Sequence, residues 1–222
     1  MSGQAHEGRS AKRRCTGVIL AGGMATRYGG APKGLELVGG RRVIDRVADA
    51  LAPTTDDLLL IANDPAATGW LPGVQVASDI RPGCGGLGGI HAALSHARTD
   101  VIVVAWDMPF IPPRLVAALR AFGELADVVV PESDSRRGVE PLCAYYSERC
   151  LAPIERRLDA GERRIVSFFD DVEVARIAAP EVATLGDPML MFLNINSPGD
   201  LALAEKHAPS TDGGHSRPQE PR

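Results

Sequence analysis

The sequence lacks both a long apolar run and an excess of positive charge. Its longest apolar runs, such as residues 101–106 and 128–130, fall far short of the roughly 20 residues that cross a bilayer as a helix. Lysine and arginine number 24 against 28 aspartates and glutamates, for a net charge of −4. A general nucleic-acid binder favours a basic face. We therefore expect no membrane span and no nucleic-acid partner, and any phosphate site must be local.

Cysteine is scarce, and its spacing gives little support to the usual metal and disulfide patterns. No two cysteines form a C-x-x-C pair; they are Cys15, Cys84, Cys143 and Cys150. Scattered cysteines in a chain of 222 residues give weak support to a zinc site or a disulfide framework, so we expect reduced thiols in the cytoplasm. Residues 1–14 also lack the apolar core of a signal peptide.

The length suits one α/β domain of ordinary size. We predict a single domain over residues 15–207. The segment 208–222 is rich in Pro, Ser, Gly and Gln, and it is predicted, like residues 1–14, to be a disordered tail.

Short β-branched runs alternate with amphipathic stretches in the first part of the chain. The runs that predict buried strands are residues 16–20, 58–62, 74–77, 101–105 and 127–130. Helices are predicted between them over 43–51, 90–96 and 113–122, the last beginning with a proline. This alternation predicts an α/β fold of three layers, with a mostly parallel, twisted sheet and helices on both faces.

The regular alternation of predicted strands and helices ends in the second part of the chain. Residues 138–146 and 172–178 read as strands, and a helix is expected from about residue 151 to Gly161. Ser197 and Pro198 are typical of a helix N-cap and first helical position, so a last helix is predicted to end near residue 207.

A glycine-rich segment with two cations follows the first predicted strand. Residues 18–23 read V-I-L-A-G-G and precede Arg27, Gly29, Gly30 and Lys33. Because glycine has no Cβ, successive backbone N–H groups can approach one anion closely. Arg27 and Lys33 add the positive charge that a polyphosphate requires. The pattern favours a triphosphate site; the alternative is a flexible turn between two core elements.

Asp107 is the candidate metal ligand. It follows the apolar run 101–106, where a buried carboxylate is costly unless it is paired or bound to a cation. Mg²⁺ prefers carboxylate oxygens together with phosphates and water. Residues 21–33 and 79–89 also follow predicted strands, so all three segments should meet in one cleft at the carboxyl ends of the sheet. The alternative is a turn aspartate before Pro109.

Five motifs, in order, make the chain resemble the family of molybdenum cofactor guanylyltransferases. The first is L-A-G-G at residues 20–23 with Arg27, Gly29 and Lys33. The others are D-I-R-P-G-C-G-G-L-G-G-I at 79–90, A-W-D-M-P-F at 105–110, E-P-L-C-A-Y at 140–145 and F-L-N-I-N-S-P-G-D-L at 192–201. The resemblance implies a Rossmann-like nucleotidyltransferase fold. It also implies Mg²⁺-dependent transfer of GMP from GTP to the terminal phosphate of molybdopterin cofactor, with release of pyrophosphate.

The resemblance also assigns roles residue by residue. It implies that the nucleotide and metal are held by Leu20, Ala21, Gly22, Gly23, Lys33, Asn63, Asp79 and Asp107. Asp107 would hold Mg²⁺ and act in catalysis with Arg27 and Lys33, and Asn63 and Asp79 would contact the base or ribose. An ordinary turn before Pro65 is an equally open interpretation of Asn63.

Asn194 and Asn196 lie on either side of Ile195 in an extended segment, so both amides should point to one face. The family places its pterin substrate near here, which implies an acceptor-binding second half after a nucleotide-binding first half. The alternative is that the two amides only join the last helix to the sheet. Arg163 and Arg164 read more readily as a solvated turn than as an anion site.

Other functions stay open from the sequence. One is a CTP-dependent transferase acting on the same cofactor or another small phosphate; another is a nucleotide- or cofactor-binding accessory protein without catalysis. Residues 83–88 satisfy the dinucleotide fingerprint G-x-G-x-x-G, but residues 78–82 separate it from the preceding strand. Transient contact with cofactor-carrier proteins or apo-molybdoenzymes is also left open.

Overall fold

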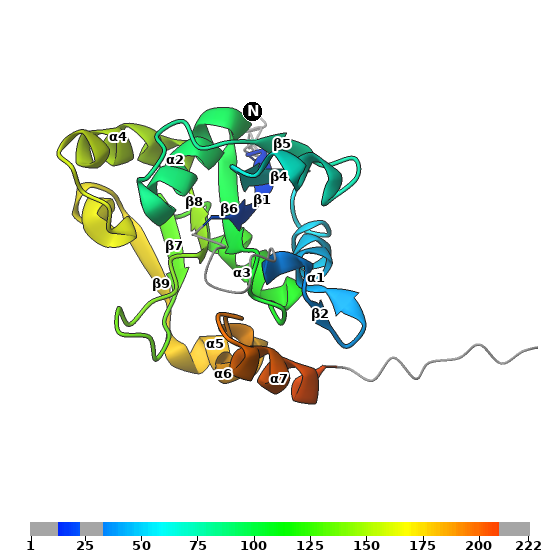
Figure 1. The fold of residues 1–222 in the computed structure, drawn as a ribbon. Helices are drawn as coiled ribbons and strands as arrows, with labels where there is room; N and C mark the ends of the chain where they lie inside the picture. The colour runs from blue at the N-terminus through cyan, green and yellow to red at the C-terminus, as the bar shows by residue number, and fades with distance from the viewer. Residues whose placement is uncertain (1–12, 23–32, 209–222) are drawn as a thin grey trace, which may run out of the picture.

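The computed structural model describes residues 13–22 and 33–208, which build a seven-stranded sheet with helices on both faces (Figure 1). The strands lie in the order β5-β4-β1-β6-β8-β7-β9. In chain order they are β1 (Cys15–Ala21), β4 (Asp57–Ala62), β5 (Gln75–Ala77), β6 (Asp100–Ala105), β7 (Val128–Pro131), β8 (Cys143–Tyr146) and β9 (Val174–Ile177).

The first four strands of the sheet are parallel, as the alternating pattern predicts. β1 pairs in parallel with β4 on one side and with β6 on the other, and β4 pairs in parallel with β5. The first six residues of β1 are buried, which is why this strand reads as a continuous apolar run. All five strands predicted in this part of the chain have ends within one residue of those observed.

The helices are α1 (Val43–Leu51), α2 (Gly85–Ala97), α3 (Pro113–Phe122), α4 (Leu151–Asp159), α5 (Ala179–Leu185), α6 (Pro188–Met191) and α7 (Pro198–His207). Residues 13–22 and 33–208 also contain four short 3-10 helices: η2 (Lys33–Leu35), η3 (Pro65–Gly69), η4 (Glu148–Cys150) and η5 (Ile165–Asp171). The predicted bounds of α1 and α3 are confirmed.

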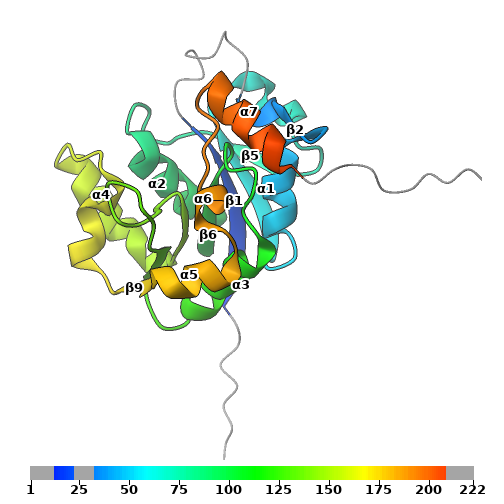
Figure 2. The same cartoon turned by 90° about the horizontal axis from the view of Figure 1, so that it is seen from below.

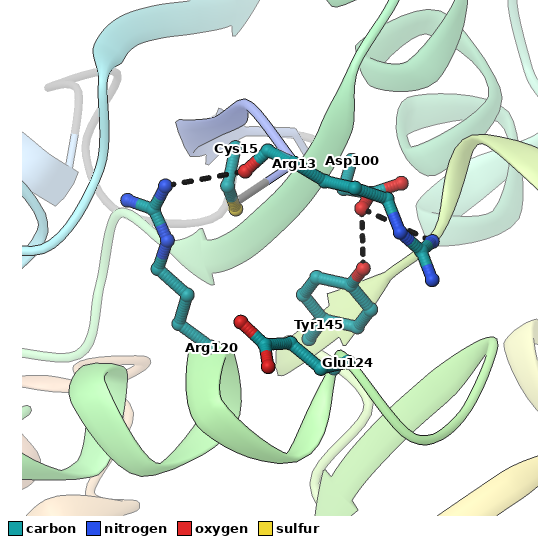
Figure 3. Close-up of a pocket in the computed structure, with 7 residues that line it drawn as sticks. Arg13, Cys15, Asp100, Arg120, Glu124 and Tyr145 are labelled. Carbon is teal, nitrogen blue, oxygen red and sulfur yellow. Dashed lines mark hydrogen bonds and ion pairs between the residues drawn. The ribbon is translucent and has the colours of Figure 1, made fainter. Parts of the chain in front are cut away.

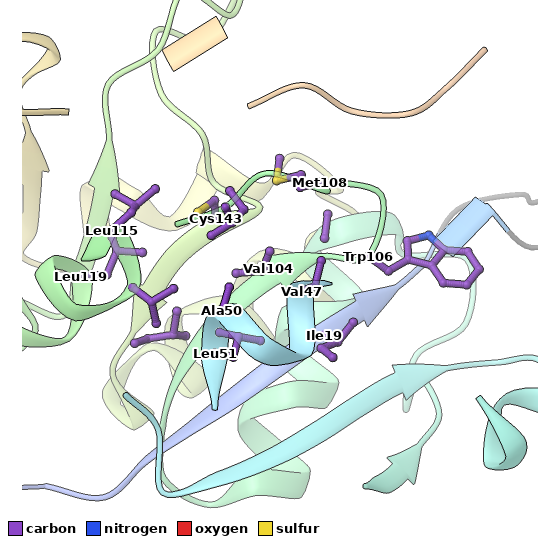
Figure 4. Packing of buried hydrophobic residues seen from close by; sticks show 14 of the residues in the cluster. Ile19, Val47, Ala50, Leu51, Val104, Trp106, Met108, Leu115, Leu119 and Cys143 are labelled. Atoms are coloured by element: carbon purple, nitrogen blue, oxygen red, sulfur yellow. The ribbon is translucent and has the colours of Figure 1, made fainter. Parts of the chain in front are cut away.

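Alternate residues of the central strands point to opposite faces of the sheet and pack into two separate hydrophobic cores. This arrangement confirms the three-layer fold. Ile19 of β1 and Val104 of β6 pack with residues of α1 and α3, among them Leu51 and Leu115 (Figure 4). Their neighbours in sequence, such as Val18, pack with α2 and α4 on the other face. Because helices cover both faces of the sheet, a ligand can reach the sheet at the edge where the strands end.

The second part of the sheet departs from the prediction. β8 is antiparallel to both β6 and β7, and β7 is parallel to β9. The strand predicted over 138–146 is wrong before Cys143, because residues 140–142 form a turn in which Cys143 N–H donates to Glu140 O at 3.1 Å. Pro141 in this turn has no N–H to donate to a strand partner.

Several elements were not predicted. β2 (Leu37–Val38) and β3 (Arg41–Arg42) form a hairpin whose loop, Gly39 and Gly40, has positive φ at both positions, as tight hairpin loops require. α5 and α6 were also missed, and α2 begins five residues before the predicted start at residue 90.

The C-terminal helix was predicted correctly. The hydroxyl of Ser197 accepts a hydrogen bond from Asp200 N–H at 3.2 Å, and Pro198 occupies the first turn of α7. Most of the two predicted tails lies outside the described residues. Within residues 13–22 and 33–208, no helix is both long enough and apolar enough to cross a membrane.

Candidate active site

The carboxyl ends of β4, β1 and β6 meet at one edge of the sheet. Ala21 pairs with Ala62, so Gly22 and Asn63 leave neighbouring strands side by side. On the other side of β1, Trp106 N–H donates to Leu20 O at 3.3 Å, immediately before Asp107. The chain passes from β1 to β4 on one side and returns to β6 on the other, which makes this edge a topological switch point where α/β sheets bind ligands.

The segment between α6 and α7 closes over this edge. Seen from below, α6 and the chain that leads to α7 pass in front of β1 and β6 (Figure 2). Ile195 N–H donates to Asp107 O at 3.0 Å, and the Ile195 side chain is buried against Val38, Val43 and Ala204. The residues on either side of Ile195 are thereby fixed beside the end of β6.

Lys33, Asp107 and Asn196 come together here, as the motifs predict for the first two. Lys33 Nζ donates to Asn196 Oδ1 at 2.8 Å. Burial raises the pKa of Asp107, and the positive charge of Lys33 is one of the two effects that oppose this rise. Asn194 behaves differently, since its amide donates to Phe192 O of its own segment at 3.0 Å.

Lys33 is positioned by the close approach of its neighbour Gly34 to an indole ring. A Cβ on Gly34 would overlap the side chain of Trp106, so only glycine fits there without displacement. Trp106 is itself held by Trp70, with stacked rings whose centroids are 5.1 Å apart. The start of η2 thus rests directly on the residue that precedes Asp107.

Asp107 is half-buried, and its carboxylate is poorly compensated by the described residues. Burial raises its pKa, while its own backbone N–H and the charge of Lys33 act in the opposite direction. No ion pair within 4.0 Å involving Asp107 occurs between residues of the described ranges. Such a carboxylate favours a cation, as the sequence predicts.

A second half-buried carboxylate, Glu140, lies within electrostatic reach of Asp107. Burial is the main cause that raises the pKa of Glu140, and the negative charge of Asp107 raises it further. The backbone N–H of Leu142 and the charge of Arg137 lower it. Glu140 belongs to the motif E-P-L-C-A-Y, but the motif alone predicts no role for it, because the direction of β8 cannot be predicted from the sequence.

These residues fit a magnesium ion. The donor atoms at this edge are carboxylate and amide oxygens, the ligands that Mg²⁺ prefers. In the described part of the chain, no three or more His, Cys, Asp or Glu side chains gather into a metal site of their own. Mg²⁺ commonly uses one or two carboxylates and takes its remaining ligands from substrate phosphates and water, so Asp107 would be a sufficient anchor.

Asn63 and Asp79 form a reciprocal pair beyond the ends of β4 and β5. Asn63 Nδ2 donates to Asp79 Oδ2 at 2.8 Å, and Asp79 N–H donates to Asn63 Oδ1 at 2.9 Å. Because Asn63 follows the strand next to β1, the pair flanks Gly22 on the side away from Asp107. Contact with a base or ribose by these two residues stays a prediction.

The structure describes only some of the remaining predicted site residues. Leu20 and Ala21 end β1, and Gly89 of α2 lies against the Leu20 side chain so closely that a Cβ would clash. Gly23 and Arg27 lie outside the described residues. Arg164 pairs with Glu162 at 3.5 Å, in keeping with the solvated turn predicted for it.

Two hollows in the described structure lie at the other edge of the sheet. One, of about 20 Å³, is lined by Arg13, Asp100, Arg120, Glu124 and Tyr145 among others (Figure 3). The other, of about 530 Å³, is lined mainly by the amino ends of β1, β4 and β5. Neither contains a predicted site residue, so the candidate site is defined by its side chains and strand ends rather than by these hollows.

Comparison with known proteins gives one family. The family model described as "MobA-like NTP transferase domain" matches residues 17–174. A protein of Desulfosudis oleivorans named molybdenum cofactor guanylyltransferase is 37% identical over 193 residues, which is 86% of this chain and 94% of that protein. One of Vibrio cholerae with the same name is 35% identical over 188 residues, or 83% and 88% of the two chains.

Solved structures of similar proteins are consistent with this family and with the fold. The crystal structure titled molybdopterin-guanine dinucleotide biosynthesis protein A from Archaeoglobus fulgidus has a TM-score of 0.73 and 29% identity, over 86% of this chain and 97% of that one. A 4-diphosphocytidyl-2C-methyl-D-erythritol synthase from Anaerococcus prevotii has a TM-score of 0.67 at 13% identity, over 88% and 96%, and shares the fold alone.

Proposed function

Because this chain belongs to the family of MobA-like NTP transferases, we propose that it transfers GMP from GTP to the phosphate of molybdopterin cofactor and releases pyrophosphate. The observation that carries the proposal is the approach of Lys33, Asp107 and Asn196 at the ends of β1 and β6. Relatives named molybdenum cofactor guanylyltransferase match over 83% of the chain or more, in agreement with this chemistry.

The reaction exchanges one phosphoanhydride bond at the α-phosphorus of GTP for another. An oxygen of the acceptor phosphate attacks the α-phosphorus of GTP, and the bond from that phosphorus to the bridging oxygen of the β-phosphate breaks as pyrophosphate leaves. The nucleophile is already an anionic oxygen, so no covalent enzyme intermediate is required. The protein has to align the two substrates and offset their negative charge.

The charged residues divide this work. Lys33, with Arg27 from the same motif, would offset the charge of the triphosphate and of the departing pyrophosphate. Asp107 would hold Mg²⁺, which neutralises charge shared between the phosphates when it is bound. The backbone of Leu20, Ala21 and Gly22 would line the nucleotide, and Gly23 would continue this surface.

The other assigned residues select and orient the substrates. Asn63 and Asp79, beyond the neighbouring strands, would contact the base or ribose. Asn196 orients Lys33 and, with Asn194, would face the acceptor, which agrees with an acceptor-binding second half of the chain. GTP and molybdopterin are then the partners, and contact with a cofactor carrier or an apo-molybdoenzyme belongs to the same proposal. The described cysteines are buried thiols, in keeping with a cytoplasmic enzyme.

The test is the initial rate of pyrophosphate release with purified molybdopterin cofactor as acceptor. We expect release with GTP and Mg²⁺ that exceeds release with CTP, and loss of release in Asp107→Ala. Faster release with CTP would identify a cytidylyltransferase. Tight GTP binding without any pyrophosphate would identify an accessory protein that only binds nucleotide.

A further inference from the structure

Asn196, which accepts a hydrogen bond from Lys33, is held through the backbone on both sides. On its amino side, Ile195 is buried and its N–H donates to Asp107 O at 3.0 Å. On its carboxyl side, Asn196 N–H itself donates to Oδ2 of Asp200 at 3.0 Å. Because the Asn196 side chain is exposed, these backbone bonds and not side-chain burial determine where its amide lies.

The carboxylate of Asp200 takes part in the cap of α7, but one of its bonds goes beyond the cap. Ser197 is the N-cap residue, and its hydroxyl accepts from Asp200 N–H at 3.2 Å and donates to Asp200 Oδ2 at 2.8 Å. In the usual capping box, the acidic side chain three residues later accepts from the N–H of the N-cap residue itself. Here Asp200 Oδ2 accepts from the N–H of the preceding residue, Asn196. The carboxylate therefore joins α7 to the residue that contacts Lys33.

α7 is itself fixed against the segment that carries Lys33. The helix lies beside β2 (Figure 2), and Ala204 of α7 is buried with Val38 of β2 in a small hydrophobic core. In the β2–β3 loop, Gly39 N–H donates to Glu205 Oε2 at 3.1 Å. This hairpin follows η2, which begins at Lys33. The helix that bears the carboxylate is therefore attached to the segment that bears the lysine.

We propose that Asp200 is a positioning residue for Lys33. Its carboxylate holds Asn196 N–H, and this bond places the Asn196 amide where it accepts from the Lys33 ammonium. The inference rests on the proposed function, which assigns Lys33 to the triphosphate of GTP. A lysine ammonium sits on a flexible four-carbon stem, so a fixed partner is needed to hold it in one direction. Loss of the Asp200 carboxylate should therefore reach the reaction through Asn196.

A role in helix stability alone is the competing explanation, because a negative charge in the first turn stabilises a helix. Asp200→Asn removes the charge but keeps an oxygen that can accept from Asn196 N–H and Ser197 Oγ, which share one carboxylate oxygen in the structure. Asp200→Ala removes both the charge and the acceptor. Asp187→Ala is the matched control for loss of a helix cap, since the Asp187 carboxylate accepts from Met189 N–H of α6 at 3.0 Å.

The experiment measures kcat/KM for guanylyl transfer with GTP as the varied substrate. We expect Asp200→Ala to lower kcat/KM by about 10-fold, a typical effect of losing a group that orients a site residue. Asp200→Asn should stay within about twofold of the wild type, because the hydrogen bonds are kept. Asp187→Ala should match the wild type. Equal losses in Asp200→Asn and Asp200→Ala would show that the charge of the helix cap is the cause, and would overturn the proposal.

A double variant tests whether the effect passes through Asn196. In the Asn196→Ala background, adding Asp200→Ala should change kcat/KM by less than about twofold, because the amide that Asp200 positions is already gone. Residues that act independently would instead give the product of the two single losses. That product would contradict the proposal.

A second measurement does not need the transfer reaction. A trace of acetic anhydride acylates lysine amines, and mass spectrometry of the digested protein gives the labelling rate of Lys33 relative to Lys206, an exposed lysine on α7. We expect this ratio to rise in Asp200→Ala and in Asn196→Ala, because the Lys33 amine is no longer held in its hydrogen bond. It should stay unchanged in Asp200→Asn and Asp187→Ala.

The labelling separates this inference from the proposed function. An unchanged ratio in Asp200→Ala, with normal pyrophosphate release by the wild type, would overturn the positioning role and leave the proposed function intact. Absence of pyrophosphate release by the wild type would overturn the proposed function, while a raised ratio in Asp200→Ala would still support the positioning of Lys33.

Discussion

The ammonium group of Lys33 donates a 2.8 Å hydrogen bond to Oδ1 of Asn196, which lies 163 residues further along the chain. The bond joins η2, after the first strand, to the segment that precedes the last helix. Ile195 N–H bonds to Asp107 O, so the same C-terminal segment is attached to both charged residues of the site. The two ends of the described chain therefore meet at the edge of the sheet that forms the candidate active site.

Removing the amide of Asn196 should release Lys33. We expect Asn196→Ala to lower kcat/KM for guanylyl transfer by about 10- to 100-fold, the usual effect of losing a group that orients a site residue. Gln75→Ala, which removes an exposed amide at the amino end of β5, is the control and should leave kcat/KM unchanged. Steady-state kinetics with GTP as the varied substrate make the comparison. Equal losses in the two variants would contradict the orienting role.

A methyl group at Gly34 should displace Lys33. In Gly34→Ala the new Cβ overlaps Trp106, so we expect a loss of about 1–3 kcal/mol in the free energy of unfolding and a marked loss of kcat. The control is Gly69→Ala, since a Cβ on Gly69 meets no atom within 4 Å. Urea unfolding and kinetics on both variants test this. Wild-type activity in Gly34→Ala would show that the close contact of Gly34 with Trp106 does not determine the position of Lys33.

Arg120 should matter for stability and not for catalysis. Its largely buried guanidinium donates to Thr54 O and, at 2.7 Å, to Asp56, at the amino ends of the strands and so opposite the candidate active site. We expect Arg120→Ala to cost about 1–3 kcal/mol of unfolding free energy and to leave kcat/KM unchanged. Arg114→Ala, an exposed arginine of the same helix, should change stability by at most about 0.5 kcal/mol. A large loss of kcat/KM in folded Arg120→Ala would be inconsistent with this division.

Asp56 should make the stability depend on pH. The hydrogen bond from Cys15 N–H, and then Arg120, lower the pKa of Asp56 below its ordinary value of 3.8, although burial opposes them. The stabilisation is therefore present above pH 3.8 and is lost as the pH falls through the lower pKa of the folded state. Asp56→Asn should be less stable than the wild type at pH 7, and the difference should vanish in strong acid.

Unfolding by urea at a series of pH values measures this difference. Asp134→Asn, in the exposed β7–β8 loop, removes one charge and serves as the control. A stability difference between Asp56→Asn and the wild type that stays constant down to strong acid would contradict the assignment.

The sequence predicted the parallel half of the fold well because local patterns determine it. The apolar run of β1 predicts a buried strand, and the apolar stripe of α1 predicts a helix. The order of these elements then predicts that Lys33 and Asp107 lie at the same edge of the sheet. The antiparallel β8 was not predictable in this way, since an apolar strand carries no mark of its direction. Glu140 was given no role for the same reason, because it lies in the turn that leads into β8. The bond from Lys33 to Asn196 depends on packing across the whole chain.

The transfer of label from GTP tests the central claim most directly. With molybdopterin cofactor, Mg²⁺ and the wild-type protein, label from the α-phosphate of GTP should appear in the cofactor product, and label from the γ-phosphate should leave as pyrophosphate. The same incubation with Asp107→Asn should leave both labels in GTP. Recovery of the γ-label in the product, or of no label in the product with the wild type, would contradict the account.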